Sequence, residues 1–505
     1  MRVILRLVWC VVFWSALSAW CEEPPPWAGE RGRVSARELQ VTTVPAAPEA
    51  LSLEDALRLG FANNAGFRSS IASLLDTQSD LRVTQQLYAI TASGSTRTTD
   101  PGENGTITRT SLATDLDYDL LTGASISVSA LLDRLDSEQS SALSVAVTQP
   151  LLRGAGRSSA RYEALRSAYT AYRRALLQFF LNRQDLALDI IRSYFGVVRA
   201  QDQVAIEEQG LMQADRAVKY AEDRLKEGMT TRIEVARAQL SQASRRLSLS
   251  RVRRSVHDEM DTFLQTLGLQ VGAGPALTTR VVYRPVTLET EALVSEALAK
   301  RAEVRIRELV LEDTRAAVRL SRNRRRPSLD LFGETVRPLE GDGNATEWTL
   351  GVQTSIPIGS RRLGEAVRQA ERSWLVAQRG YTELTQNVST QVRREVHALE
   401  SQQANLDILR QTLEVAREKL RLAAISVEEG VGVDRDKIEA QDEVTNAERD
   451  LVDAETDYYF GVLDLRRAVG RDVLEGLAGE TKPAEPSKAA PGSEESGAPA
   501  GKGGQ

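Results

Sequence analysis

The sequence has few of the residues on which disulfide frameworks, metal sites and many active sites depend. It has two cysteines, Cys10 and Cys21, and two histidines, His257 and His397. Both cysteines lie in or beside the N-terminal leader, so no intramolecular disulfide framework is available. Both histidines fall in helical patterns, and no phosphate-binding loop or nucleophile elbow is present. We therefore expect no metal, no cofactor and no enzymatic activity.

Aromatic residues are also scarce, at 5% of the chain, and neither sign of charge dominates. The 64 basic and 70 acidic residues are mixed along the chain and give a formal charge of -6. No large single-sign field is present to hold a polyanion, so we expect no nucleic acid partner. A composition rich in Ala, Leu, Gln, Arg and Glu instead favours long helices.

Long apolar runs are absent beyond the N-terminus, where a spanning helix would need roughly 18 uncharged residues. The first residues combine Arg2 and Arg6 with a following apolar run, which predicts a signal peptide over 1–20. Trp20 is not the small residue that a lipoprotein peptidase prefers, so lipidation of Cys21 is disfavoured but stays open. A chain that crosses a membrane without apolar helices must use strands.

An internal repeat is the most informative feature. Gly228 lies 11 residues before Gln239, and Gly430 lies 11 residues before Gln441, so the two copies are offset by 430 minus 228, or 202. The duplication covers whole helices.

The repeat defines the domain organisation, because the same offset carries Gly268 onto Gly470. We predict a first repeat over 51–270, an inter-repeat linker over 271–285 and a second repeat over 286–475. The Pro-rich segment 21–50 indicates an extended linker, and the small, polar composition of 476–505 indicates a disordered tail.

Apolar residues on both sides of each tip glycine recur at the three- and four-residue spacings of a heptad seam. A glycine between two such arms predicts a helical hairpin turn, since glycine adopts positive φ without steric cost. The arm from Arg157 to Glu227 would reach roughly 100 Å as a helix, with a break in the seam at Glu207. Two seams illustrate the pattern: Ile233, Ala236, Leu240, Ala243 and Leu247 after Gly228, and Leu406, Leu409, Leu413, Ala416 and Leu420 before Gly430.

Between the helical arms the apolar period changes to two, which predicts strands with one apolar and one polar face. Such strands suit a water-filled barrel in lipid, although a soluble sheet would show the same alternation. The alternating runs are Leu116–Leu120, Ala124–Val128 and Leu143–Val147 in the first half, and Leu329–Leu331 and Trp348–Ile356 in the second.

Basic residues gather where three of the four strand–helix junctions are expected. At the inner rim of a barrel they would face the headgroups of a leaflet that contains anionic phospholipid, whereas solvated charge without a partner explains them equally well. They are Arg153, Arg157, Arg322, Arg324, Arg325, Arg326, Arg361 and Arg362.

From about residue 51 to 470, the chain resembles the TolC-like outer-membrane efflux family. The resemblance rests on Leu51-Ser52-Leu53-Glu54-Asp55-Ala56-Leu57, on Thr148-Gln149-Pro150-Leu151-Leu152, and on the two glycine-centred hairpin tips. Each motif alone is weak, but their order, the duplication and the signal peptide together are specific.

The resemblance implies an α+β membrane protein that assembles as a homotrimer. Long antiparallel coiled-coil hairpins would form a periplasmic α-barrel, and four strands per subunit would contribute to a twelve-stranded outer-membrane β-barrel. The protein would be the channel of a tripartite efflux or type I secretion system, working with a periplasmic adaptor and an inner-membrane transporter. The alternative is a secreted or surface coiled-coil structural protein without transport activity.

The resemblance also implies functional residues at the periplasmic end. Asp436 and Glu439, with Glu234 at the corresponding place in the first half, would narrow the aperture. Rings of like charge there would attract cations. Solvated carboxylates on a helix face are the alternative reading. The tips Gly228, Met229, Thr230, Gly430, Val431 and Gly432 would contact the adaptor.

The closed aperture of relatives is often locked by a basic residue two positions after the second tip glycine, where this chain has Gly432. We hypothesise that Arg435 replaces it by pairing with Glu234 or Asp434.

Overall fold

The structure is a computed structural model, and it describes residues 50–85, 88–99, 107–135, 138–272, 274–281, 285–286, 288–339, 346–429, 434–475 and 481–483. The predicted signal peptide (1–20), residues 21–49 of the predicted linker and most of the predicted tail lie outside these residues. Thr481–Pro483 (β10) belongs to the predicted tail but pairs antiparallel with Thr279–Val281 (β7), so this short stretch is part of the fold. No helix in the described part is long and apolar enough to cross a bilayer.

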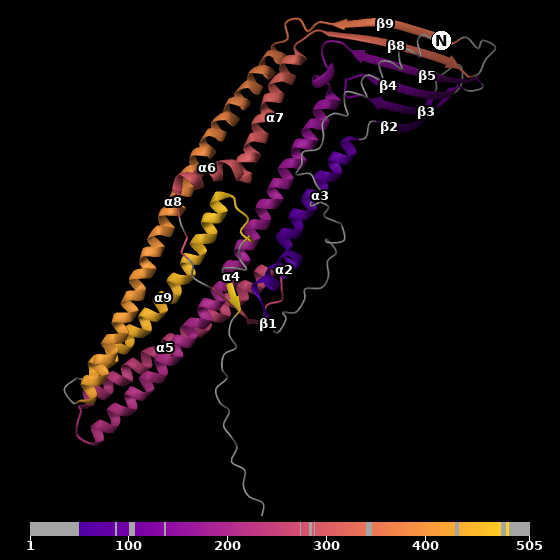
Figure 1. The fold of residues 1–505 in the computed structure, drawn as a ribbon. Coiled ribbons are helices and arrows are strands. Elements are labelled where there is room, and N and C mark those ends of the chain that lie inside the picture. The colour runs from indigo at the N-terminus through magenta and orange to yellow at the C-terminus, as the bar shows by residue number, and fades with distance from the viewer. Residues whose placement is uncertain are drawn as a thin grey trace, which may run out of the picture.

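Four long helices form two hairpins (Figure 1). Helix α4, Ala160–Lys226, packs against α5, Arg232–Leu267, and α8, Arg361–Glu428, packs against α9, Asp434–Val469. The 67 residues of α4 extend about 100 Å at 1.5 Å per residue. The predicted hairpins are therefore confirmed.

Each hairpin is accompanied by two shorter helices, and we call a hairpin with its two shorter helices a column. In the first half these are α2, Leu53–Asn63, and α3, Ala65–Gln85; in the second they are α6, Thr290–Lys300, and α7, Ala302–Arg324. Helix α3 packs on α4, and α7 packs on α8 and α4.

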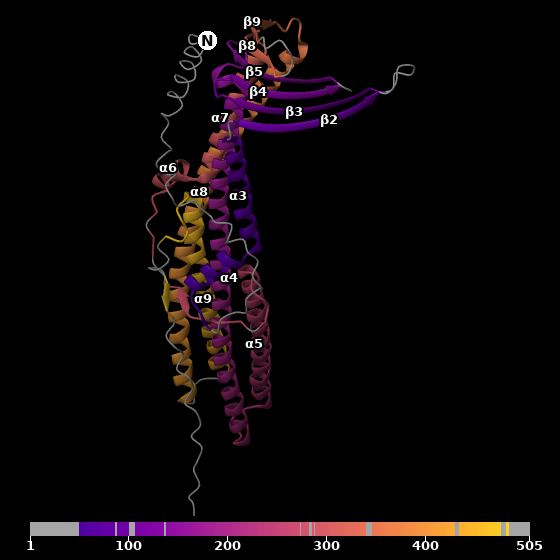
Figure 2. The same ribbon diagram turned by 90° about the vertical axis from the view of Figure 1, so that its right-hand side faces the viewer.

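The long helices stand side by side in the order α5–α4–α9–α8, because α4 contacts α9 and joins the hairpins. Figure 2 shows α5 and α8 at opposite edges of this layer.

The hairpin-facing side of α5 differs from the predicted seam. Val235, Ala238 and Leu249 are buried, whereas Ile233 and Leu240 of the predicted seam are exposed. The apolar pattern of the sequence pointed to the wrong face of α5. The face that packs against the other helices includes the polar residue Arg245, whose partners come from those helices.

Each repeat has a joint, which is the bend between its two short helices. Asn64 has φ -61 and ψ 122 between α2 and α3, and Arg301 has φ -60 and ψ 129 between α6 and α7. Gly268 (φ 70) and Gly470 (φ 82) pack against these bends at the ends of α5 and α9. The repeat seen in the sequence is therefore a repeat of structure.

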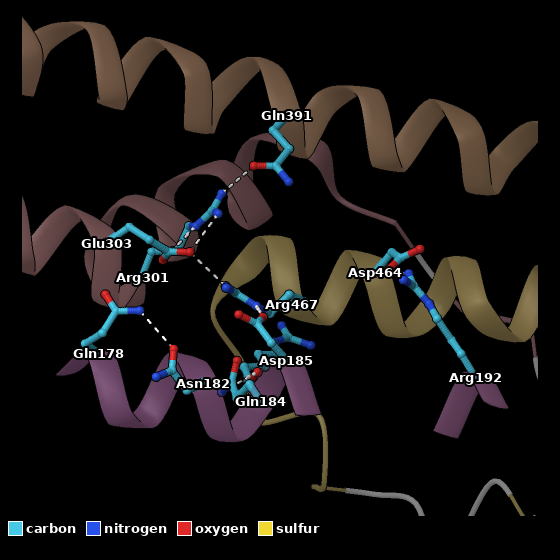
Figure 3. A network of polar contacts seen from close by, with 11 residues as sticks. Gln178, Asn182, Gln184, Asp185, Arg192, Arg301, Glu303, Gln391, Asp464 and Arg467 are labelled. Carbon is cyan, nitrogen blue, oxygen red and sulfur yellow. Dashed lines mark hydrogen bonds and ion pairs between the residues drawn. The ribbon is translucent and has the colours of Figure 1, made fainter. Parts of the chain in front are cut away.

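Polar contacts tie the second joint to neighbouring helices (Figure 3). Arg467 on α9 donates to Asp185 on α4 and to Glu303 on α7, both at 2.9 Å. Arg301 donates to Glu303 and, at 2.8 Å, to Gln391 on α8. Burial acts to raise the pKa of Glu303, but hydrogen bonds, chiefly from Arg301, outweigh it and hold that pKa below its usual value.

Aromatic rings fill the core beside the first joint. Tyr194 is fully buried and packs edge-on against Phe195 and Phe263. Its hydroxyl donates to the carbonyl of Leu51 at 3.2 Å and accepts from the amide of Thr279 at 2.9 Å. Leu51 belongs to a two-residue parallel pair formed by Ala50–Leu51 (β1) and Ala276–Leu277 (β6). The start of the first repeat is thus fixed to the segment between the repeats.

A single antiparallel sheet covers the other end of the helices. Its order is β2-β3-β4-β5-β8-β9, and β5 pairs with β8 to join the halves. The strands are β2, Tyr88–Thr99; β3, Ile107–Asp119; β4, Ser125–Leu135; β5, Glu138–Pro150; β8, Ser328–Pro338; and β9, Glu347–Ser355.

The number of strands differs from what the family resemblance implied. The resemblance implied four strands per subunit, whereas the described part of the chain contributes six strands to this sheet. The first half has two hairpins because the chain reverses between Asp119 and Ser125, where Gly123 has φ 91 and the Leu120 amide donates to the Ala124 carbonyl at 2.8 Å. The α+β architecture is confirmed.

Candidate functional site: the hairpin tips

The tip of the first hairpin is a tight glycine turn. Gly228 has φ 75 and its amide donates to the Leu225 carbonyl at 3.1 Å, while the Met229 amide donates to the Arg224 carbonyl at 2.8 Å. These two bonds form a Schellman motif, which satisfies the last carbonyls of α4. Met229 is 64% exposed, and Thr230 beside it is half-buried. The predicted tip therefore presents a flexible apolar side chain to the surroundings.

The tip of the second hairpin is described on its two sides. Helix α8 ends at Glu428, and α9 begins at Asp434. The predicted contact residues Gly430, Val431 and Gly432 lie outside the described residues.

Glu234 lies in the first turn of α5, and its side chain is largely buried. Its Oε1 accepts a hydrogen bond from Arg237 at 2.7 Å, three residues along the same helix. Its Oε2 is buried without a hydrogen-bond partner in the described part of the chain.

Asp436 and Glu439 are exposed on the first turns of α9. Arg435 donates from Nε to Glu439 Oε1 at 2.7 Å, one helical turn away. This hydrogen bond is the main reason that the pKa of Glu439 lies below its usual value and that of Arg435 above. Arg435 therefore forms its ion pair with Glu439. Of its two hypothesised partners, Glu234 makes no ion pair with it among the described residues, and the side chain of Asp434 lies outside them.

Packing of α9 against the first hairpin brings these charges together. Glu234 and Arg237 from α5 line one open groove with Arg435, Ile438 and Glu439 from α9. Asp436 is not part of the lining. The structure thus joins two of the three predicted acids, each already paired with an arginine.

This pairing separates the three predicted acids. Glu234 and Glu439 each pair with an arginine of their own helix, Arg237 and Arg435 respectively. Asp436 is the acid that has no ion pair within the described residues. Sequence reasoning missed the neutralising role of Arg237, although its i,i+3 spacing from Glu234 is a visible signal.

Comparison with known proteins decides the family. The outer membrane efflux protein model matches residues 107–269 and 293–471, which together make up more than half of the chain. The chain belongs to the outer membrane efflux protein family. This is a family of channel proteins, and the protein accordingly lies in the outer membrane and extends into the periplasm.

Relatives and solved structures agree with this assignment. Outer membrane protein TolC of Vibrio cholerae is 22% identical over 330 residues, covering 63% of this chain and 75% of TolC. Alkaline protease secretion protein AprF of Pseudomonas aeruginosa is 24% identical over 328 residues, covering 59% and 67%. The fold matches the Vibrio cholerae outer membrane protein VceC with a TM-score of 0.65 and 16% identity, over 83% of this chain and 96% of VceC. It matches the open-state MtrE channel of Neisseria gonorrhoeae at 0.63 and 15%, over 86% and 94%.

Proposed function

We propose that the protein is the homotrimeric outer-membrane channel of a tripartite efflux or type I secretion system. It receives solutes from an inner-membrane transporter through a periplasmic adaptor that contacts the hairpin tips. Family membership favours this function over a coiled-coil structural protein without transport activity. The observation that carries the proposal is a pair of matching apolar stripes at the two edges of the helix layer.

One stripe runs along the outer side of α5 and the other along the outer side of α8. Their members are 53–72% exposed, and within each stripe they lie seven residues apart. This is the spacing of a coiled-coil seam whose partner is missing. The α5 stripe is Ile233, Leu240 and Leu247, and the α8 stripe is Ile408, Val415 and Leu422.

The two stripes lie at similar distances from their tips, with a constant offset. Ile233, Leu240 and Leu247 lie 5, 12 and 19 residues after Gly228, and Leu422, Val415 and Ile408 lie 8, 15 and 22 residues before Gly430. The difference is three residues at every level, or about 4.5 Å of helix. Since α5 runs away from its tip and α8 toward its tip, α8 of one copy can pack antiparallel against α5 of the next.

Such a contact joins different surfaces of two identical chains, so it forms a ring when the rotation closes. Three copies of the four-helix layer then give a tunnel of twelve helices. The sheet supports the same closure, because β2 and β9 are its two edges. Open edges in lipid leave backbone groups without partners at a cost of several kcal/mol each.

Three sheets of six strands give an eighteen-stranded barrel, and its girth fits the helical tunnel. Twelve helices spaced by 8–10 Å make a ring of roughly 100–120 Å. Eighteen strands about 4.8 Å apart and tilted by about 40° make a ring of roughly 110 Å, whereas twelve such strands make roughly 75 Å. Six strands per chain therefore allow a channel of nearly constant width.

At the periplasmic end we assign the aperture to Asp436, with Glu439 and Glu234 partly neutralised beside it. Three copies of the tip bring three unpaired Asp436 carboxylates around one axis, which attracts cations. The tip residues Gly228, Met229 and Thr230, and their counterparts Gly430, Val431 and Gly432, form the adaptor-contacting surface.

Cysteine cross-linking tests the assembly. In a Cys21→Ser background, the pair Leu240→Cys and Val415→Cys should give disulfide-linked dimers and trimers under mild oxidation. Leu240→Cys with Met212→Cys is the control, because Met212 is also exposed but lies on α4, away from the edges. Folded protein that gives no more cross-linked species than the control contradicts the arrangement. Single-channel conductance of the purified trimer in a planar bilayer tests the transport function itself.

A further inference from the structure

Three chain connections meet at the helix-side end of the sheet. Register brings the ends of adjacent strands together, with Pro150 of β5 opposite Asp330 of β8, and Ser328 of β8 opposite Ser355 of β9. The connection after β5 is fixed to the end of α7, because the Gly154 amide donates to Asn323 Oδ1 at 3.0 Å. These connections therefore lie next to one another where the strands join the helices (Figure 1), and we name them together the collar: residues 150–159, 322–328 and 356–362.

The collar is rich in arginine and has no acid of its own. Its three segments include eight arginines and no Asp or Glu. Among the described residues, one collar arginine forms an ion pair, Arg322 with Glu371. All but Arg153, which is half-buried, are exposed: Arg157, Arg322, Arg324, Arg325, Arg326, Arg361 and Arg362.

Large apolar side chains are exposed among these arginines. Leu151, Leu152, Ile356 and Ile358 are 48–90% exposed in the same segments. Ile356 and Ile358 come directly after the exposed apolar row of β9 formed by Trp348, Leu350 and Val352. A boundary where an apolar surface ends in arginines matches the interface of a bilayer, where aliphatic side chains enter the acyl region and guanidinium groups remain at headgroup level.

We propose that the collar binds anionic phospholipid headgroups in the inner leaflet of the outer membrane. The inference rests on the proposed position of the sheet in that membrane. Guanidinium groups suit phosphate oxygens because they can donate two parallel hydrogen bonds. The exposed isoleucines and leucines favour a lipid over free phosphate, since they gain a partner only if acyl chains are present. The lipid thereby sets the depth of the channel in the membrane and stabilises the junction between sheet and helices.

Lipid-dependent thermal stability tests the proposal. Purified full-length trimer in neutral detergent is titrated with phosphatidylglycerol, and separately with phosphatidylcholine and with glycerol phosphate. Phosphatidylglycerol alone should raise the unfolding temperature. Arg325→Gln with Arg326→Gln should weaken its apparent affinity about 5- to 30-fold, since each arginine near an anionic surface contributes roughly 1 kcal/mol. The difference should shrink at high salt.

The matched control is Arg216→Gln with Arg253→Gln, which removes the same charge from exposed sites on α4 and α5 far from the sheet. It should keep the wild-type response. An equal response of both variants, or of wild type to both lipids, overturns the proposal. So does a variant that keeps its lipid response but changes the ion selectivity of the channel, because the arginines then face the pore. Wild-type conductance without lipid preference would leave the proposed function standing, whereas a folded trimer that never conducts would contradict that function.

Discussion

Arg245 on α5 places its guanidinium Nη1 3.3 Å from Oε2 of Glu207 on α4, and both side chains are withdrawn from solvent. Arg245 also donates to Asp442 on α9 at 2.6 Å, and Arg449 on α9 lies 3.6 Å from the other Glu207 oxygen. The break in the predicted heptad seam at Glu207 is thus the point at which the two hairpins are joined by charge. Next to it, Gly210 packs closely against Thr445, which only a small residue permits.

Replacing Arg245 alone should lower the stability of the protein far more than replacing Arg245 and Glu207 together. Arg245→Met leaves Glu207, which is 1% exposed, with a single, more distant partner, and an uncompensated buried charge costs roughly 3–5 kcal/mol. We expect Arg245→Met to lower the unfolding temperature of the trimer clearly. The double variant Glu207→Leu with Arg245→Met should recover most of that loss. Arg246→Met is the control, because the neighbouring Arg246 is exposed and should contribute little. A double variant no more stable than Arg245→Met would show that the charges themselves are needed.

Ion selectivity should depend on Asp436 more than on Glu439. Asp436 lacks an ion pair in the described part of the tips, whereas Arg435 neutralises Glu439. Asp436→Asn should therefore lower the cation preference, measured as a reversal potential in a salt gradient, and Glu439→Gln should lower it less. Arg435→Gln should raise it. Asp258→Asn on α5, far from the tips, should leave it unchanged. If Glu439→Gln has the larger effect, our assignment of Asp436 as the main aperture residue is wrong.

The helical part of the fold was predictable because its signals are local. Glycine between heptad arms fixes the hairpins, and the 202-residue offset fixes their repetition. The strand count was not predictable in this way. Strand β2 has only Ser, Gly, Thr and Arg from Ser93 to Thr99, so apolar alternation stops halfway along it, and its existence depends on pairing with β3.

The tip site shows the same division between local and distant contacts. The pairs Arg435–Glu439 and Glu234–Arg237 follow from helical spacing and could be read from the sequence. That they share one groove could not, since it requires α9 to pack Ile438 against the first hairpin, beside Val235 and Ala238. From the sequence we hypothesised instead that Arg435 pairs with Glu234 or Asp434.

Acid should weaken the contact between α6 and the end of α9. Glu296 accepts hydrogen bonds from Arg471 and Lys300, and these lower its pKa from 4.5 to about 2. Because the pKa of Glu296 is lower in the folded state, its ionised carboxylate stabilises the fold. This stabilisation is fully present above about pH 4.5 and is lost as the pH falls toward 2. Its size is roughly 1 kcal/mol after allowance for the exposed partners.

The measurement is the unfolding temperature of wild type and Glu296→Gln between pH 7 and pH 3. The two should differ at pH 7 and converge as the pH falls below 4.5. Glu291→Gln, on the same helix but with an exposed ion pair to Arg393, should track wild type throughout. A constant difference between wild type and Glu296→Gln would mean that protonation of Glu296 is not the cause.

Glycines at the joints and at the tip should tolerate alanine differently, although all have positive φ. At Gly268 a Cβ would lie 2.7 Å from the Asn63 carbonyl oxygen, whereas at Gly228 no atom of the described residues lies within 4 Å of it. Gly228→Ala should therefore cost only backbone strain, roughly 1–2 kcal/mol, and Gly268→Ala should cost more, because backbone atoms of the joint must also move. Gly364→Ala, in open space within α8, should be neutral or slightly stabilising. Unfolding temperatures should fall in the order Gly364→Ala, Gly228→Ala, Gly268→Ala. If Gly228→Ala and Gly268→Ala lower the unfolding temperature equally, the backbone at the joint adjusts at little cost in free energy, and the joint does not hold the two columns of helices in place.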